Sequence, residues 1–236
     1  MAGPPTAHRM LRWIAGLSLA LNAAVAGLWG VRHLRLSRPA PGLRERARND
    51  LFHALAVGPV THRDVVVVGD SLTERGEWWE LLERPVANRG VAGDTVAAVR
   101  ARLDDVAALD PRVVFVLVGI NDLLAGASPE ALAARHAALI AELRGRLPRA
   151  RIVAESLLPI RDELVARDAE LTSATVRRAN ELCRRAAADA GVDWLDLHAR
   201  LADPEGELDP RYSSDGLHLS GAGYRAWAAA VLPYLP

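Results

Sequence analysis

The chain has 236 residues, of which half are hydrophobic and a quarter are charged. This length and balance are typical of one globular domain with or without an appendage, and they exclude a disordered or low-complexity protein. The single cysteine, Cys183, excludes an intrachain disulfide and a cysteine-based zinc site. All 29 basic residues are arginines, so the sequence also excludes a Walker A phosphate-binding loop and a lysine nucleophile.

The net charge of zero hides an asymmetry along the chain. Residues 1–48 contain eight arginines and one acidic residue, whereas residues 49–236 contain 21 arginines and 28 acidic residues. An acidic body lacks the basic surface that binds nucleic acid, so we expect no nucleic-acid partner. The basic N-terminus needs a different explanation.

Residues 13–31 form an apolar segment, WIAGLSLALNAAVAGLWGV, without any charge. As a helix it would be roughly 28 Å long, about the thickness of the hydrocarbon core of a bilayer. Arginines flank it on both sides, and Trp13 and Trp29 stand near its ends, where tryptophan lies at membrane interfaces. These features predict a single-pass membrane anchor over residues 13–31.

Two other interpretations of this segment stay open. Ala24-Val25-Ala26 matches the small-residue pattern of a signal-peptide cleavage site, although the apolar run continues past it. The other is a buried core helix, although core helices rarely have arginine and tryptophan at both ends. For the anchor, two arginines before the segment and three after it favour a cytoplasmic body. A short basic tail before one apolar helix is instead typical of an export signal-anchor. We therefore expect a cell-membrane location and favour a body outside the cytoplasm, although the sequence leaves the side open.

The rest of the chain alternates short apolar runs with longer amphipathic ones. A basic tail is expected over residues 1–12, a proline-containing linker over 32–42 and the globular domain over 43–236. Strands are predicted at 65–68, 86–88, 113–118, 151–155 and 192–197, and helices at 43–57, 95–108, 129–147, 172–190 and 220–232. This alternation predicts an α/β fold, a three-layer α/β/α sandwich with a mostly parallel five-stranded sheet.

Polar residues suited to catalysis follow several of these strands. Because ligands bind at the carboxyl ends of the strands in such sheets, the residues directly after each strand are the candidates. They form four blocks: Gly69-Asp70-Ser71-Leu72, Gly93-Asp94-Thr95, Gly119-Ile120-Asn121-Asp122 and Asp215-Gly216-Leu217-His218. Turns and helix caps explain any one block, but four of them at one sheet edge indicate a functional site.

Together the four blocks supply the groups that acyl transfer needs. The hydroxyl of Ser71 is a weak nucleophile that requires an adjacent base, and His218 is the candidate. Asp215, three residues earlier, is close enough in the chain to accept the other imidazole proton and fix the tautomer. The backbone N–H groups of Ser71 and Gly93 and the side-chain amide of Asn121 are candidate donors to an oxyanion.

These blocks resemble those of the SGNH (GDSL) hydrolase superfamily, in the same order, over about residues 63–234. The stretches VVVVGDSLTERGEWWELL, NRGVAGDT, VLVGINDL and SSDGLHLSGAGY are most similar to its platelet-activating-factor acetylhydrolase-like and carbohydrate O-acetylesterase-like branch. The resemblance implies a flavodoxin-like sheet and no metal or other cofactor. It also implies roles for five residues: Ser71 as nucleophile, Gly93 and Asn121 as oxyanion donors, and Asp215 with His218 completing the triad. No G-x-S-x-G turn surrounds the serine, which disfavours the α/β-hydrolase fold.

Three further residues are candidates for contact with the substrate. Asp70 precedes the predicted nucleophile, although a hydrogen bond within its own turn is the simpler role. Trp78, with its neighbour Trp79, follows the nucleophile loop: one of the pair could border an acyl pocket, although core packing is expected for at least one. Arg161 lies after the fourth predicted strand, on the same side of the sheet, and could bind an anionic or sugar group or be solvated.

We therefore expect a serine esterase that hydrolyses short O-acyl groups, acetyl above all, from a carbohydrate or a lipid through an acyl-enzyme on Ser71. A lysophospholipase or acyl-thioesterase with a long acyl groove is the alternative within the same superfamily. A membrane-tethered binding module without catalysis is a third hypothesis, against which the intact Ser71, Asn121, Asp215 and His218 argue. The sequence leaves the natural substrate and the oligomeric state open.

Overall fold

The computed structural model describes residues 48, 51–52, 55, 64–165 and 171–236. Within these residues, no helix has both the length and the apolar character needed to cross a membrane. The predicted tail (1–12), anchor (13–31) and linker (32–42) lie outside the described residues, as does most of the predicted helix 43–57. Its described residues 48, 51, 52 and 55 are helical.

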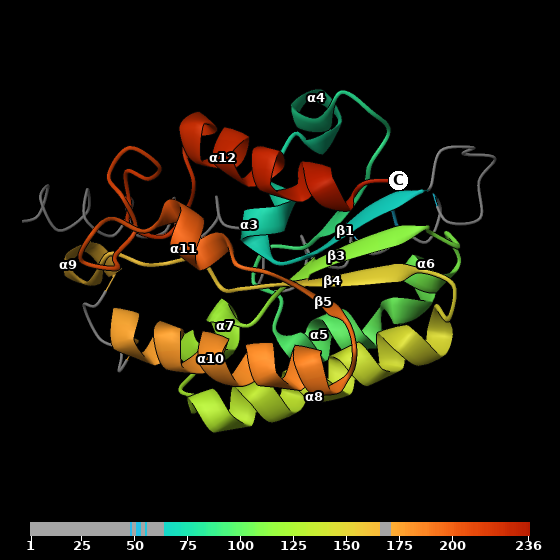
Figure 1. The fold of residues 1–236 in the computed structure, drawn as a ribbon, viewed down its shortest axis with the longest axis horizontal. Coiled ribbons are helices and arrows are strands. Elements are labelled where there is room, and N and C mark those ends of the chain that lie inside the picture. The colour runs from blue at the N-terminus through green and yellow to red at the C-terminus, as the bar shows by residue number, and fades with distance from the viewer. Residues whose placement is uncertain (1–47, 49–50, 53–54, 56–63, 166–170) are drawn as a thin grey trace, which may run out of the picture. The chain divides into compact units, whose positions relative to one another are not determined.

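A five-stranded parallel sheet forms the centre of the domain (Figure 1). Its strands are β1 (Val65–Gly69), β2 (Ala87–Gly90), β3 (Val113–Leu117), β4 (Arg151–Glu155) and β5 (Asp193–Leu195), in the spatial order β2-β1-β3-β4-β5. The continuous apolar runs of β1 and β3 suit strands that are buried on both faces. All five predicted strands are confirmed, with small shifts at their ends.

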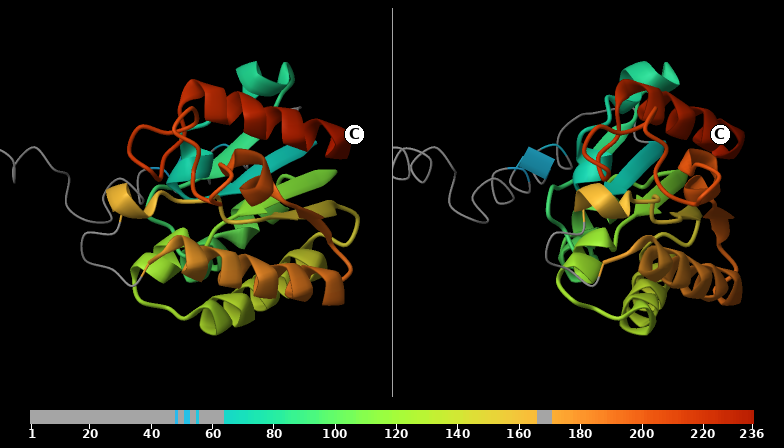
Figure 2. Two further views of the ribbon diagram at one scale, coloured as in Figure 1. Left: turned by 60° about the vertical axis from the view of Figure 1, so that its left-hand side comes forward. Right: turned by 90° about the vertical axis from the view of Figure 1, so that its left-hand side faces the viewer.

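Helices cover both faces of this sheet (Figures 1 and 2). One face packs against α5 (Val96–Ala101), α8 (Pro129–Arg146) and α10 (Ser173–Asp189), and the other against α4 (Trp78–Leu82), α11 (Leu197–Leu201) and α12 (Gly221–Val231). Within β1, Val66 and Val68 belong to the first of these cores, and Val65 and Val67 to the second. The predicted three-layer α/β/α sandwich is thereby confirmed.

The predicted helix over residues 95–108 is wrong in one respect, because the chain forms two short helices there. These are α5 and α6 (Leu103–Ala107), and the break lies at Arg102, with φ −120° and ψ 19°. Five more helices are only four or five residues long, too short to show a periodicity in the sequence. They are α3 (Ser71–Glu74), α4, α7 (Ile120–Leu124), α9 (Asp162–Val165) and α11, and a 3₁₀ turn, η1 (Leu232–Tyr234), follows α12.

The order of the strands creates a binding position at the carboxyl end of β1. β1 pairs with β2 on one side and with β3 on the other. The connection after β1 therefore leads to one edge of the sheet, at β2, and the connection after β3 leads towards the opposite edge, through β4. A crevice forms at such a point in open parallel sheets, and ligands bind there. Three of the four predicted blocks follow β1, β2 and β3 and therefore lie together at this end of the sheet.

Glycine at position 90 allows the first turn after β1 to lie directly on the end of β2. A Cβ atom on Gly90 would lie 2.2 Å from the backbone nitrogen of Glu74 and 2.6 Å from its Cα, both in α3. Backbone atoms cannot move aside as the end of a flexible side chain can. The close contact between α3 and β2 therefore requires glycine at this position.

We predict that Gly90→Ala lowers the free energy of unfolding by more than about 1 kcal/mol, as overpacking of a tight contact does. Urea unfolding followed by tryptophan fluorescence measures this change. Gly145→Ala in α8 is the control, because an added Cβ there would meet no neighbouring atom within 4 Å. The control should be stabilised by roughly 0.5–1 kcal/mol, the helix penalty of glycine. Wild-type stability of Gly90→Ala would contradict the tight contact.

Candidate active site

Ser71 begins the short helix α3, directly after β1. The helix starts here because Asp70 caps it, with Oδ1 accepting a hydrogen bond from the Leu72 backbone N–H at 3.0 Å. Ser71 is only partly buried, and its Oγ lies 3.2 Å from Nε2 of His218. The predicted nucleophile and base are therefore within hydrogen-bonding distance although 147 residues separate them in the chain.

Asp215 orients the imidazole ring of His218. The distance from His218 Nδ1 to Asp215 Oδ2 is 2.8 Å, and the backbone N–H groups of Leu217 and His218 donate to Asp215 Oδ1 at 3.0 and 2.7 Å. Partial burial alone would raise the pKa of Asp215, but these hydrogen bonds together outweigh it and lower the pKa to about 2. The carboxylate is therefore ionised at neutral pH and holds the ring with Nε2 towards Ser71.

The loop that follows β2 carries Gly93 and is tied to both neighbouring blocks. The Val91 N–H donates to the carbonyl of Gly69 at 3.0 Å, two residues before Ser71 in the chain. Nδ2 of Asn121, in the first turn of α7, donates to the carbonyl of Asp94 at 2.9 Å. Gly93 has φ +90°, a conformation that favours glycine. The predicted oxyanion donors thus belong to segments in direct contact with one another.

Of the three candidate substrate contacts, Trp78 and Arg161 are engaged within the fold. The Trp78 ring is 2% exposed and packs edge-on against Trp227, with its Nε1 donating to the carbonyl of Thr73 at 2.8 Å. Core packing, expected for at least one of the two tryptophans, is therefore confirmed for Trp78, whereas Trp79 is 60% exposed.

The guanidinium of Arg161 is paired with acidic residues of the same domain. Its guanidinium pairs with Asp203 at 2.5 Å and with Glu207 at 3.2 Å, and it donates to the carbonyl of Leu208. Its backbone N–H donates to the carbonyl of Gly216, next to Asp215. Arg161 therefore supports the loop that carries the triad carboxylate, and its contact with an anionic or sugar group stays a prediction.

Asp70, the third candidate, is fully buried behind Ser71. Its Oδ1 caps α3, and its Oδ2 has no hydrogen-bond partner among the described residues. Burial raises the pKa of Asp70 to about 7, the Leu72 N–H opposes this, and the charges of Asp94 and Asp122 add to it. The simpler role predicted for it, a hydrogen bond within its own turn, is confirmed.

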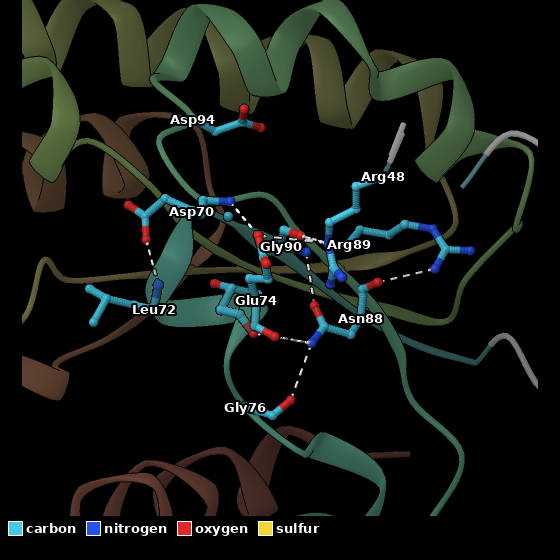
Figure 3. A network of polar contacts seen from close by, with 12 residues as sticks. Arg48, Asp70, Leu72, Glu74, Gly76, Asn88, Arg89, Gly90 and Asp94 are labelled. Atoms are coloured by element: carbon cyan, nitrogen blue, oxygen red, sulfur yellow. Dashed lines mark hydrogen bonds and ion pairs between the residues drawn. The ribbon is translucent and has the colours of Figure 1, made fainter. Parts of the chain in front are cut away.

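Two residues outside the predicted site, Asn88 and Tyr224, hold α3 in place. Nδ2 of Asn88 in β2 donates to the carbonyls of Thr73, Glu74 and Gly76 at 3.1 to 3.2 Å (Figure 3). The Tyr224 hydroxyl in α12 donates to the carbonyl of Leu72 at 2.8 Å. Both residues lie in the stretches NRGVAGDT and SSDGLHLSGAGY that carry the family resemblance, but their partners are backbone atoms of distant segments, which local patterns do not reveal.

Comparison with known proteins identifies the family. Residues 67–226 match the GDSL-like lipase/acylhydrolase family. The chain belongs to this family. It is accordingly a hydrolase of carboxylic esters, in a family that acts on small ester substrates. No curated protein matches the chain.

Solved structures with this fold are distant in sequence. A Streptococcus pneumoniae protein described as a platelet activating factor is 22% identical, with a TM-score of 0.74 over 92% of this chain and 99% of its own. A GDSL-like lipase from Bacteroides thetaiotaomicron is 20% identical, with a TM-score of 0.67 over 79% of this chain and 96% of its own. A variant of a Geobacillus acetyl-xylooligosaccharide esterase is 21% identical, with a TM-score of 0.59 over 72% and 92%.

We predict that Asp70→Asn stabilises the protein more at pH 8 than at pH 5. Asn keeps the acceptor for the Leu72 N–H. In the wild type, the unfolded chain loses the Asp70 proton near pH 4, whereas the folded chain keeps it up to about pH 7. Stability is therefore lost as the pH rises between these values. Urea unfolding at both pH values should show the benefit of the substitution growing by more than about 1.4 kcal/mol, the equivalent of one pKa unit.

The pH-independent cost of burying an amide cancels in this difference. A benefit that is equal at pH 5 and pH 8 would mean that Asp70 ionises in the folded protein near its ordinary pKa, and would contradict the prediction.

Proposed function

We propose that this family member is a serine esterase that removes short acyl groups, acetyl above all, from a carbohydrate or a lipid through an acyl-enzyme on Ser71. The observation that carries the proposal is the continuous contact from Ser71 Oγ to His218 Nε2 at 3.2 Å and from His218 Nδ1 to Asp215 Oδ2 at 2.8 Å. A serine hydroxyl becomes a competent nucleophile only beside such an oriented base.

In the acylation half of this reaction, Ser71 Oγ attacks the ester carbonyl carbon while its proton moves to His218 Nε2. The carbonyl π electrons move onto oxygen and form an oxyanion. The ionised carboxylate of Asp215 stabilises the resulting imidazolium without taking its proton. The oxyanion then re-forms the carbonyl, the bond to the alcohol oxygen breaks, and His218 donates its proton to that oxygen.

Deacylation repeats these steps with water in the place of Ser71. His218 removes a proton from the water, whose oxygen attacks the acyl carbon, and the bond to Ser71 Oγ breaks as that oxygen regains the proton. In both halves, the Ser71 and Gly93 N–H groups and the Asn121 amide would donate to the oxyanion. Such donors stabilise charge that develops only in the transition state, so they raise kcat rather than affinity.

The preference for a short acyl group has support from packing near the nucleophile. Two of the large apolar side chains that follow Ser71, Leu72 and Trp78, are each 2% exposed and committed to the core, whereas a third, Trp79, is 60% exposed. Leu72 and Trp78 leave no apolar surface at the nucleophile turn itself. Neither is free to line a groove for a long acyl chain. The Asp215 side chain is 53% exposed, so this edge of the site is open to a bulky alcohol. A related fold acting on acetyl-xylooligosaccharides adds support for an acetylated carbohydrate.

We predict that kcat/KM is highest for the acetate in a series of p-nitrophenyl esters from acetate to decanoate. The reason is that Leu72 and Trp78 are packed in the core and do not line a groove for a long acyl chain. Ser71→Ala and His218→Ala should each lose at least about 10³-fold in kcat, as triad removals do, while keeping the wild-type melting temperature. A fluorophosphonate should label the wild type on Ser71 and should leave Ser71→Ala unlabelled.

Two results would contradict different parts of this proposal. Labelling or turnover that persists in Ser71→Ala would reject the nucleophile. A kcat/KM that rises steadily towards the decanoate would retain the nucleophile and favour the lysophospholipase or acyl-thioesterase alternative.

We also propose that residues 13–31 anchor the esterase domain in the cell membrane, with the domain on the extracytoplasmic side. The support is the uncharged length of the segment and its flanking tryptophans and arginines. None of the four catalytic blocks lies before residue 69, so attachment and catalysis should be separable.

We predict that the full-length protein sediments with membranes and resists carbonate extraction. A chain beginning at about residue 40 should stay in the supernatant and hydrolyse a small ester as fast as the full-length protein in detergent. Fractionation followed by ester assays measures both properties. A soluble full-length product with its N-terminus at Gly27 would instead support a cleaved signal peptide, and an inactive short chain would place residues 13–31 in the core.

A further inference from the structure

We propose that Glu74 and Arg102 are positioning residues that hold the oxyanion loop, residues 92–94, from both sides of Gly93. This inference rests on the proposed function, because it assigns a purpose to two buried charges through the N–H group of Gly93. Neither residue belongs to the four blocks, and neither takes part in the hydrogen bonds that join Ser71, His218 and Asp215.

Glu74 holds the first residue of the loop. Its side chain is 7% exposed, and its Oε2 accepts a hydrogen bond from the Ala92 N–H at 2.5 Å. Arg48 Nε lies 3.8 Å from the same oxygen and donates to the carbonyl of Gly90 (Figure 3). Glu74 is the last residue of α3 and Ser71 is the first. One four-residue helix therefore carries both the proposed nucleophile and a support for the oxyanion loop.

Arg102 holds the last residue of the loop. Its guanidinium is 6% exposed, with Nε 2.8 Å and Nη2 2.7 Å from Oδ2 of Asp94. The same group donates to the carbonyl of Arg89 at 2.8 Å and to that of Gly69 at 3.1 Å. A buried guanidinium is tolerated only when it is paired and its donors are satisfied. Arg102 meets this condition by joining the ends of β1 and β2 to the oxyanion loop.

The loop needs such support because its central residue has no side chain of its own to fix it. Gly93 has φ +90° and sits between Ala92, held by Glu74, and Asp94, held by Arg102. The Asp94 carbonyl in turn accepts from Nδ2 of Asn121. Movement of Asp94 would therefore displace two oxyanion donors together, and displacements of about 1 Å can cost 10²-fold in rate.

The decisive substitution is Arg102→Lys, because an ammonium cannot reproduce the planar fork that contacts three separate oxygen atoms. We expect kcat to fall by about 10- to 100-fold with KM within about twofold of the wild type, as for lost transition-state stabilisation. Arg100→Lys is the matched control. Arg100 lies two residues before Arg102, in α5, but pairs with Glu142 at the surface, so kcat of Arg100→Lys should be unchanged.

Glu74 is tested by two substitutions. Glu74→Ala removes the acceptor for the Ala92 N–H and should lower kcat by about 10-fold or more. Glu74→Gln keeps a carbonyl oxygen at the same length of side chain and should restore most of that loss. Equal kcat for the two variants would overturn the assignment of Glu74. Circular dichroism and melting temperature identify the folded variants to be compared.

A double-mutant cycle with Asn121 separates positioning from general destabilisation. Asn121→Ala alone should lower kcat by about 10²–10³-fold, as loss of one oxyanion donor does. If Arg102 acts by positioning the same oxyanion donors, Arg102→Lys should lower kcat by a smaller factor in the Asn121→Ala background than in the wild type. Fully additive losses, or a lowered melting temperature with wild-type kcat, would overturn the inference. Turnover that persists in Ser71→Ala would instead reject the proposed function itself.

Discussion

The carbonyl groups of α3 impose the constraint on which the rest of the site depends. A helix of four residues leaves its last carbonyls without intrahelical partners, and buried carbonyls must be hydrogen-bonded elsewhere. Three side chains from three elements provide those bonds: Tyr224 to Leu72, Trp78 and Asn88 to Thr73, and Asn88 to Glu74. The need to satisfy these carbonyls fixes α3 against α12, α4 and β2 at once.

One of these bonds also connects the nucleophile turn to the segment that carries the imidazole. Tyr224 lies six residues after His218, in the first turn of α12, which Ser220 caps. Its hydroxyl reaches the carbonyl of Leu72, the neighbour of Ser71, from 152 residues further along the chain. The histidine loop and the nucleophile turn are therefore joined by a bond independent of the contact between Ser71 and His218.

The sheet and the candidate site could largely be predicted from the sequence, because both depend on local patterns. Runs of valine predicted the central strands, and the short blocks after them predicted which residues would share an edge. Asp215 and His218 were linked by their spacing alone. The supports were missed because they bond to the backbone of segments far away in the chain, as Asn88 and Tyr224 do.

Arg102 shows where sequence patterns fail. Residues 95–108 contain no glycine or proline, so their propensity predicted one continuous helix, yet the bonds of the Arg102 guanidinium coincide with a break there. A signal was nevertheless present. Val96, Val99 and Leu103 mark the buried face of this segment, and Arg102 lies next to that face. Here the charged Arg102 beside the apolar residues, together with Asp94 just before the helix, is the sequence counterpart of the buried ion pair.

Three buried acids lie behind the nucleophile, and their charges are balanced unequally. Asp94 pairs with Arg102, and Asp122 pairs with Arg135 while accepting from the Val96 N–H. Among the described residues no cation pairs with Asp70, and burial raises its pKa to about 7. Asp70 is therefore largely neutral below that pH.

The protonation of Asp70 affects the charge beside the proposed oxyanion. An ionised Asp70 would place a negative charge one residue from Ser71, where the oxyanion must form, and at short range in a buried site such repulsion is weakly screened. Keeping Asp70 protonated avoids this repulsion and preserves its cap on α3 through Oδ1. The two arginines thus neutralise the acids that hold backbone or loops in place, whereas burial, with a smaller contribution from the charges of Asp94 and Asp122, neutralises the acid beside the nucleophile.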